Sequence, residues 1–143
     1  MATLSSNAVA STVQSRAGID LTSVTGVYTL TAALALNDVI QMVKVPLGAC
    51  IQEILVTADD LDTGGSAIRF QCGDGGSAAR FIAANAVGSN AGLAARLDTH
   101  AGHGYVYPAE DTIDLTVSTG PTGGATSGSI RLTAFYTMQQ PVT

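Results

Sequence analysis

Apolar and polar residues alternate with a period of two in three separate segments of the chain, 67–73, 112–118 and 129–137. Because successive side chains of an extended strand point to opposite faces, this period gives a strand one apolar and one polar face. Such strands are typical of antiparallel sheets. The apolar positions are Ile68, Phe70 and Cys72, then Ile113, Leu115 and Val117, then Ile130, Leu132, Ala134 and Tyr136. The alternation predicts an all-β chain.

Further strand-like runs alternate less regularly, and short segments rich in Gly, Pro, Asn and Asp separate them. The spacing predicts an antiparallel β-sandwich or jelly roll of about eight strands. The Ala-rich segment 77–97 could form two helical turns on propensity alone, but Gly88 and Gly92 favour a strand plus a loop. The less regular runs are 27–34, 38–45, 49–58, 80–84 and 104–108.

The length of 143 residues is enough for one domain that folds without a metal or disulfide, so no cofactor is expected. Residues 1–18 lack a sustained period and are expected to form an extended N-terminal arm, followed by the sandwich domain at 19–143. Cys50 and Cys72 each lie in a strand-like run. Two small buried hydrophobic side chains are the favoured interpretation, and a bridge between adjacent strands is the alternative.

Charged residues make up only 12% of the chain, about half the usual share of about 25%. The net charge is −5, Lys44 is the only lysine, and the five arginines are scattered. Nucleic-acid binding needs cations gathered on one face, so this distribution argues against it. The sequence has neither an apolar run of about 20 residues nor a signal-peptide pattern, so we expect no membrane contact and synthesis in a reducing cytoplasm.

Asp62 opens an Asp-Thr-Gly string that matches the tripeptide of aspartic proteases. Those enzymes need two carboxylates that share one proton, so a chain with one motif would have to dimerise around it. Gly65 replaces the usual Ala or Ser, and Asp59 and Asp60 add negative charge immediately upstream. A calcium loop would need a carboxylate where Gln71 stands. We therefore assign no catalytic or metal-binding residue.

Two pairs of side chains near the middle of the chain could carry binding. His100 and His103 lack further zinc ligands at suitable spacing, so they are expected at a surface or interface. Tyr105 and Tyr107 share one face of a short strand. Paired tyrosines can belong to a core, anchor a protein interface or stack on sugars.

Segment 38–45 is apolar on both faces, which a second subunit covering the strand would explain. A β-bulge that switches the faces midway would produce the same pattern. In segment 129–137, an aromatic side chain interrupts the otherwise polar face. The positions expected at an assembly interface are therefore Val39, Val43, Val45 and Phe135, together with Tyr105 and Tyr107.

Several strings together resemble the head decoration (cement) proteins of tailed bacteriophages, over about residues 30 to 137. The resemblance implies a jelly-roll-like domain that binds the outside of a capsid shell, commonly as a trimer or dimer. It carries no catalytic residues. The strings are 36–48 (LNDVIQMVKVPLG), 60–65 (DLDTGG), 73–75 (GDG), 105–107 (YVY), 111–113 (DTI) and 132–136 (LTAFY).

The resemblance predicts a virion protein made in the host cytoplasm, displayed on the outer surface of the phage head, with the major capsid protein as its partner. Such a subunit would stabilise the shell by binding the assembled lattice better than free subunits. Two alternatives remain at this point. One is a tail, baseplate or fibre module that binds host-surface glycan through Tyr105 and Tyr107. The other is a dimeric aspartic protease that uses Asp62.

Overall fold

The structure is a computed structural model, and it describes residues 1–7, 9 and 20–139. This part of the chain forms nine strands and no helix, so the all-β prediction is confirmed. No segment of it is a helix long and apolar enough to cross a membrane. The strands are β1 (Thr3–Ser5), β2 (Thr22–Thr29), β3 (Val39–Val45), β4 (Ala49–Ala58), β5 (Arg69–Gly73), β6 (Ile82–Asn85), β7 (Ala94–Arg96), β8 (Asp111–Thr119) and β9 (Ser129–Met138).

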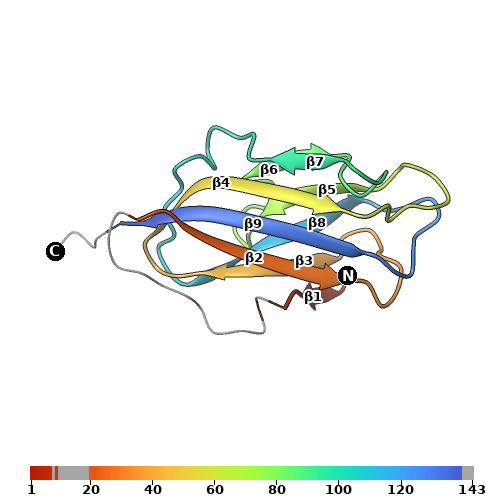
Figure 1. Cartoon of the computed structure of the whole chain (residues 1–143), viewed down its shortest axis with the longest axis horizontal. Coiled ribbons are helices and arrows are strands. Elements are labelled where there is room, and N and C mark those ends of the chain that lie inside the picture. The colour runs from red at the N-terminus through yellow and green to blue at the C-terminus, as the bar shows by residue number, and fades with distance from the viewer. Residues whose placement is uncertain (8, 10–19, 140–143) are drawn as a thin grey trace.

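Two sheets pack face to face as a sandwich (Figure 1). One has five strands in the order β1-β3-β8-β5-β6, and the other has four in the order β2-β9-β4-β7. The chain passes repeatedly from one sheet to the other, so β5 and β6 are the only consecutive strands of the described chain that pair. All pairs are antiparallel except β1 with β3. The predicted antiparallel sandwich is therefore confirmed.

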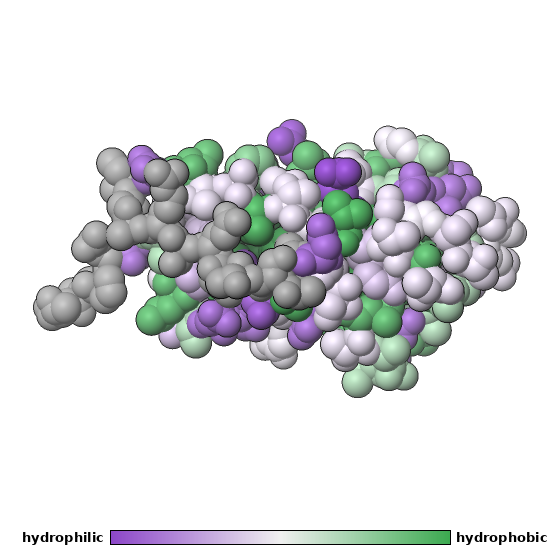
Figure 2. All heavy atoms as spheres, turned by 60° about the horizontal axis from the view of Figure 1, so that its bottom comes forward, coloured by the Kyte–Doolittle hydropathy of each residue, from purple (hydrophilic) through white to green (hydrophobic). Residues whose placement is uncertain are grey.

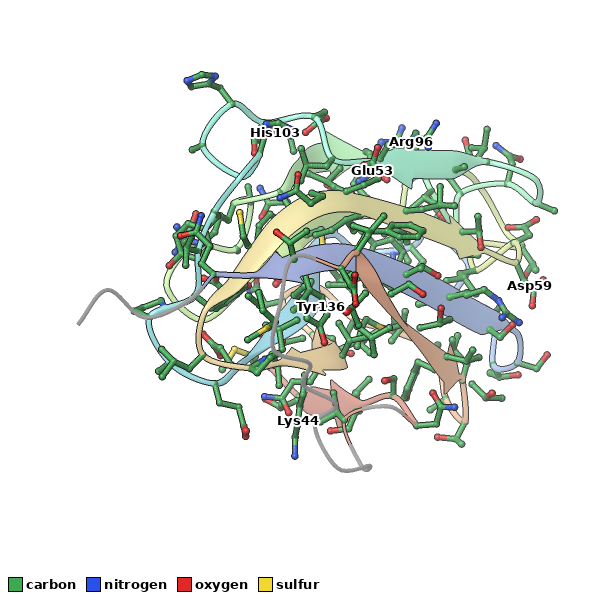
Figure 3. All side chains as sticks on the ribbon, turned by 60° about the vertical axis from the view of Figure 1, so that its left-hand side comes forward. Lys44, Glu53, Asp59, Arg96, His103 and Tyr136 are labelled. Carbon is green, nitrogen blue, oxygen red and sulfur yellow. The ribbon has the colours of Figure 1, made fainter. Side chains whose placement is uncertain are left out.

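The core lies between the sheets and consists of the side chains that the alternation marked as apolar. Leu115 of β8 and Leu132 of β9 are each fully buried, and so is Tyr136, which projects into the space between the sheets (Figure 3). Burying one such large apolar side chain contributes about 1.5–3 kcal/mol. The fully buried residues predicted from the alternation are Ile68, Phe70, Cys72, Ile113, Leu115, Val117, Ile130, Leu132, Ala134 and Tyr136.

A β-bulge in β3 explains why segment 38–45 is apolar on both faces. The pairing of β3 with β8 shifts between Gln41 and Val43, so the residues beyond the bulge change sides. Val43 and Val45 are fully buried in the chain's own core and offer no surface to a second subunit, which corrects the interface assignment for both. Val39 lies before the bulge on the outer face and is half-buried. It stays an interface prediction.

The first residues of the predicted arm form the edge strand β1, which pairs in parallel with β3. The N–H of Ala2 donates to Asp38 Oδ1 at 3.0 Å, and the Ser6 hydroxyl donates to the Met42 carbonyl oxygen. Residues 8 and 10–18 of the arm, and 19 and 140–143 of the predicted sandwich domain, lie outside the described residues.

Segment 77–97 forms strands β6 and β7 with a loop between them, as predicted. Gly88 and Gly92 have φ values of 83° and 85°, a left-handed conformation that interrupts a helix. The expected strand at 104–108 is reduced to an antiparallel bridge between Val106 and Cys50, with backbone hydrogen bonds from Gly104 to Ile51 and from Tyr107 to Ala49. Cys50 and Cys72 are buried free thiols on strands of different sheets, so the favoured interpretation of the cysteines is confirmed.

Candidate functional site

The carboxylate of Asp62 joins two glycine-containing loops that are 60 residues apart in the sequence. Its side chain is completely buried. Its oxygens accept hydrogen bonds from the backbone N–H groups of Ala67 (2.7 Å), Ile68 (3.1 Å), Thr122 (3.1 Å) and Gly123 (2.8 Å). Burial raises the pKa of Asp62, but these donors outweigh it and hold the pKa below its ordinary value.

This geometry contradicts the protease hypothesis. An aspartic protease dyad needs a carboxylate that can reach water and a second carboxylate, whereas Asp62 has no exposed surface. Both of its oxygens are also occupied by backbone donors of its own chain. Asp62 is a structural residue that fixes loops 63–66 and 120–124 against each other.

Asp62→Asn is expected to lower the unfolding midpoint at pH 7 by roughly 5 °C or more, since the amide removes the charge and places an N–H₂ group among N–H donors. Thermal unfolding followed by circular dichroism measures the effect. Asp111→Asn is the matched control, because Asp111 is exposed on β8. Equal midpoints for the two variants would contradict the structural role.

The two tyrosines belong to an aromatic cluster rather than to an exposed platform. Tyr107 is 1% exposed, and its hydroxyl donates to Asp74 Oδ2 at 3.1 Å. The ring of Tyr105 stands edge-on to that of Tyr107 with centroids 5.1 Å apart, and Arg80 lies over it at 4.0 Å. Burial raises the pKa of Tyr107 far above its ordinary value. Tyr107 is thus a core residue, and Tyr105 alone remains half-exposed as an interface prediction.

The outer face of the four-stranded sheet is nearly neutral and carries the predicted interface residue Phe135. Phe135 of β9 lies between Ser23 of β2 and Glu53 of β4, and it is half-buried. The next two rows across the sheet are Thr25-Thr133-Leu55-Arg96 and Val27-Arg131-Thr57-Ala94. We call these three rows the Phe135 face.

The Phe135 face carries three charged side chains, two of which compensate each other. Glu53 and Arg96 lie side by side above the sheet (Figure 3), with Nε and Oε2 3.7 Å apart. Arg131 is the third charged side chain of the three rows. In the view of Figure 2, strongly hydrophilic residues form small separate groups, and much of the described surface has intermediate hydropathy. A protein that covers the Phe135 face must compensate one charge, that of Arg131, which has no ion-pair partner within the three rows.

A pocket of about 370 Å³ opens on the outer face of the other, five-stranded sheet. Its lining includes Asp114 and Thr116 of β8, Val39 of β3 and residues 74–78 of the β5–β6 loop. The loop passes so close to β5 that a Cβ at Gly73 would overlap the carbonyl oxygen of Ser77. Gly73 pairs with Asp114, so the loop covers the position beside that carboxylate.

The alternation in segment 112–118 places Asp114 on the polar, outer side of its strand, and the structure confirms that side. The expected exposure to solvent is wrong. The loop leaves it 8% exposed, and its Oδ1 has no hydrogen-bond partner among the described residues. Burial, with smaller contributions from Asp111 and Asp74, raises the pKa of Asp114 to about 6, against an opposing hydrogen bond from Thr112. The other acid of the pocket, Asp74, has its pKa lowered, because Arg80 and backbone donors outweigh its burial.

Asp114→Asn is expected to stabilise the protein by about 1–2 kcal/mol at pH 8, after allowance for solvent screening, and to change little at pH 4. The folded pKa of about 6 exceeds the ordinary value of 3.8. The folded state therefore binds more protons between these values, and the cost of the Asp114 charge grows as the pH rises through that window. Urea unfolding at both pH values measures this, with Asp111→Asn as the control. A destabilised Asp114→Asn protein at pH 8 would contradict it.

The two histidines are exposed, and His103 projects away from the sandwich (Figure 3). No cluster of three or more His, Cys, Asp or Glu side chains that could hold a metal ion occurs among residues 1–7, 9 and 20–139.

No protein-family model matches the chain, and no curated protein matches it. Three solved structures are similar to it. A chain from "Capsid of Ralstonia phage GP4" has a TM-score of 0.85 and 24% identity, covering 98% of this chain and 100% of that one. A chain from "Cyanophage Pam1 capsid asymmetric unit" has a TM-score of 0.75 and 25% identity, covering 88% and 90%. One from "Acidic stable capsid structure of Helicobacter pylori bacteriophage KHP30" has 0.51 and 13%, covering 82% and 93%, and shares the fold alone.

The chain is a structural, phage-capsid-like protein. This agrees with a site that offers surfaces for contact rather than a reaction centre: a neutral sheet face around Phe135 and an acidic pocket around Asp114. Sequence reasoning placed Phe135 on an outer face but missed the pocket. The only signal for the pocket in the sequence is the glycine-rich loop 73–76, one of the segments that separate the expected strands.

Proposed function

We propose that the chain is a capsid decoration (cement) subunit that binds the outside of an assembled phage head and stabilises the shell. The observation that carries the proposal is the likeness, over nearly the whole length of both chains, to proteins in phage capsid structures. The sandwich presents contact surfaces on both outer faces, which suits a small subunit held between neighbours in a lattice.

The charge of the chain supports a place outside the shell. An inner surface of a DNA-filled head faces phosphate groups, which favour Lys and Arg gathered on one face. This chain has a net charge of −5, a single lysine and scattered arginines. An acidic subunit is therefore better suited to the outer surface than to the surface that faces packaged DNA.

The Phe135 face is the surface that we assign to contact between copies of the chain, as a trimer or dimer. Two acidic subunits repel each other, and contact is least costly where the charge differs from that of the whole chain. The face carries one acid, Glu53, and two arginines, Arg96 and Arg131, around a half-buried aromatic ring. Aromatic and arginine side chains are enriched at interfaces.

The subunit would stabilise the head because its binding is thermodynamically linked to assembly of the shell. A subunit that binds only the assembled lattice shifts the assembly equilibrium toward the intact shell. An oligomer that contacts several shell subunits at once gains effective concentration for each further contact, so individually weak contacts become strong in sum. The glycan-binding alternative has no comparable support, because Tyr107 is buried and Arg80 covers one face of Tyr105.

Heads that lack the chain should test the proposal. We expect them to assemble and close, to release their DNA at a lower temperature than complete heads, and to recover when the purified chain is added back. Dye-accessible DNA measured during a temperature ramp reports the release. Failure of heads to form without the chain would instead identify a shell-forming subunit, and unchanged release temperatures would reject the stabilising role.

A further inference from the structure

Asp114 is a buried carboxylate whose surroundings leave one oxygen unused. It is more than nine-tenths buried and lines the pocket on the five-stranded sheet, and its Oδ1 has no hydrogen-bond partner in the described part of the chain. A buried charge without a partner is costly, so such a group takes up a proton or meets a cation.

The neighbouring acid Asp74 lines the same pocket and differs from Asp114, because both of its carboxylate oxygens accept hydrogen bonds. It accepts hydrogen bonds from the N–H groups of Gly76 and Ser77, from Nε and an Nη of Arg80, and from the Tyr107 hydroxyl. Its charge is thus fully engaged inside the chain. Of the two acids that line the pocket, only Asp114 keeps an acceptor oxygen without a hydrogen-bond partner among the described residues.

No cation of the described chain forms an ion pair with Asp114, and this includes the N-terminal ammonium of Met1, a residue that also lines the pocket. Arg80 is committed to Asp74 at 2.7 Å, and the other ion pair among the described residues joins Arg96 to Glu53. Lys44 lies on the neighbouring strand opposite Thr112, and Figure 3 shows it projecting outward from the sandwich. Asp111 is exposed and is not among the residues that line the pocket. Asp114 therefore brings to the pocket a negative charge that no ion pair of the described chain compensates.

The shape and lining of the pocket favour an amphipathic cation over a metal ion. At about 370 Å³ it has more than ten times the volume of one water molecule, which is about 30 Å³. Val39 and Ala78 give it apolar walls, and Thr116 adds a hydroxyl. A metal ion would need several oxygen ligands, whereas one carboxylate suffices for the charged end of a side chain with an alkyl stem.

We propose that this pocket receives a lysine or arginine side chain from the protein on which the subunit assembles, with the alkyl stem against Val39 and Ala78 and the charge on Asp114. The identity of the partner rests on the proposed function, and the chemistry of the ligand does not. An acidic chain with net charge −5 is complementary to a basic contact on the shell. The exposed arginines Arg96 and Arg131 of a second copy lie on the Phe135 face, which we assign to self-contact.

The ligand chemistry is tested on the free full-length protein by NMR titration with Nα-acetyl-lysine amide, at pH 7.5. Nα-acetyl-norleucine amide, which has a similar alkyl chain and no charge, is the matched probe. We expect saturable shifts of residues 74–78 and 116 with the lysine probe and none with the norleucine probe. Asp114→Asn should weaken lysine binding at least tenfold, and Asp111→Asn should change it less than twofold. Equal weakening by both variants, or no saturable shift, overturns the proposal.

The partner is tested by binding of the same variants to heads that lack the chain. We expect Asp114→Asn to bind at least tenfold more weakly than Asp111→Asn, and unchanged binding overturns the assignment of the pocket to the shell. If the parent protein binds no heads while the probe titration succeeds, the proposed function fails and the ligand chemistry stands. Loss of self-association in Asp114→Asn, measured by sedimentation, would identify a second copy as the source of the cation and overturn the shell assignment.

Discussion

Phe135→Glu is expected to weaken self-association of the chain by about a hundredfold, the effect of removing a central aromatic contact of an interface. The substitution also places a second negative charge beside Glu53, which lies opposite Phe135 on β4. Like charges directly opposite each other on neighbouring strands repel. Because Phe135 lies on the outer face of the sheet and not in the core, the sandwich itself should remain folded.

Sedimentation velocity over a range of concentrations measures the oligomeric state, and circular dichroism checks the fold. Thr119→Glu is the matched control, since it adds the same charge at an exposed position on the five-stranded sheet. We expect the control to associate like the parent protein. A Phe135→Glu protein that keeps the oligomeric state of the parent would show that the Phe135 face is not the contact between copies.

Gly26→Ala is expected to destabilise the fold by about 3 kcal/mol or more and to lower the unfolding midpoint by roughly 10 °C. A Cβ at Gly26 would overlap the carbonyl oxygen of Met42 and meet the Ser6 hydroxyl at 2.7 Å. The overlap is with backbone, so no side-chain rotation relieves it. Strand β2 would have to move away from β3, where the two sheets approach each other.

Gly75→Ala is the control for that substitution, because a Cβ at Gly75 meets nothing within 4 Å. We expect its midpoint to lie within about 2 °C of the parent protein. Differential scanning calorimetry compares the three proteins. A Gly26→Ala protein as stable as Gly75→Ala would mean that β2 and β3 do not approach each other as described.

The fold was predictable where one face of a strand is buried and the other is exposed to solvent. Strand β9 shows this most clearly, with Ile130 and Leu132 fully buried and Arg131 between them exposed. The same rule was ambiguous in β3, since a bulge and a second covering subunit produce the same residue pattern. Only the register with β8 distinguishes them, and register depends on residues about 70 positions away.

The candidate site was less predictable because its features depend on contacts between distant loops. Asp62 matched a catalytic tripeptide, yet two of its four donors come from loop 120–124. The alternation placed Asp114 on an outer face correctly, but its burial depends on a loop folding back over that face. Apart from the glycines of loop 73–76, local sequence carries no signal for either event. Phe135 was identified because it interrupts the alternation of apolar and polar residues in its own strand. Such an interruption is visible in the sequence without knowledge of distant contacts.

A cryo-electron microscopy reconstruction of the phage particle tests the central claim most directly. The account predicts a two-layer sandwich on the outer surface of the head, with the Phe135 face against another copy and the Asp114 pocket against the shell protein. Density for this chain in the continuous shell that encloses the DNA, or only in the tail, would contradict it.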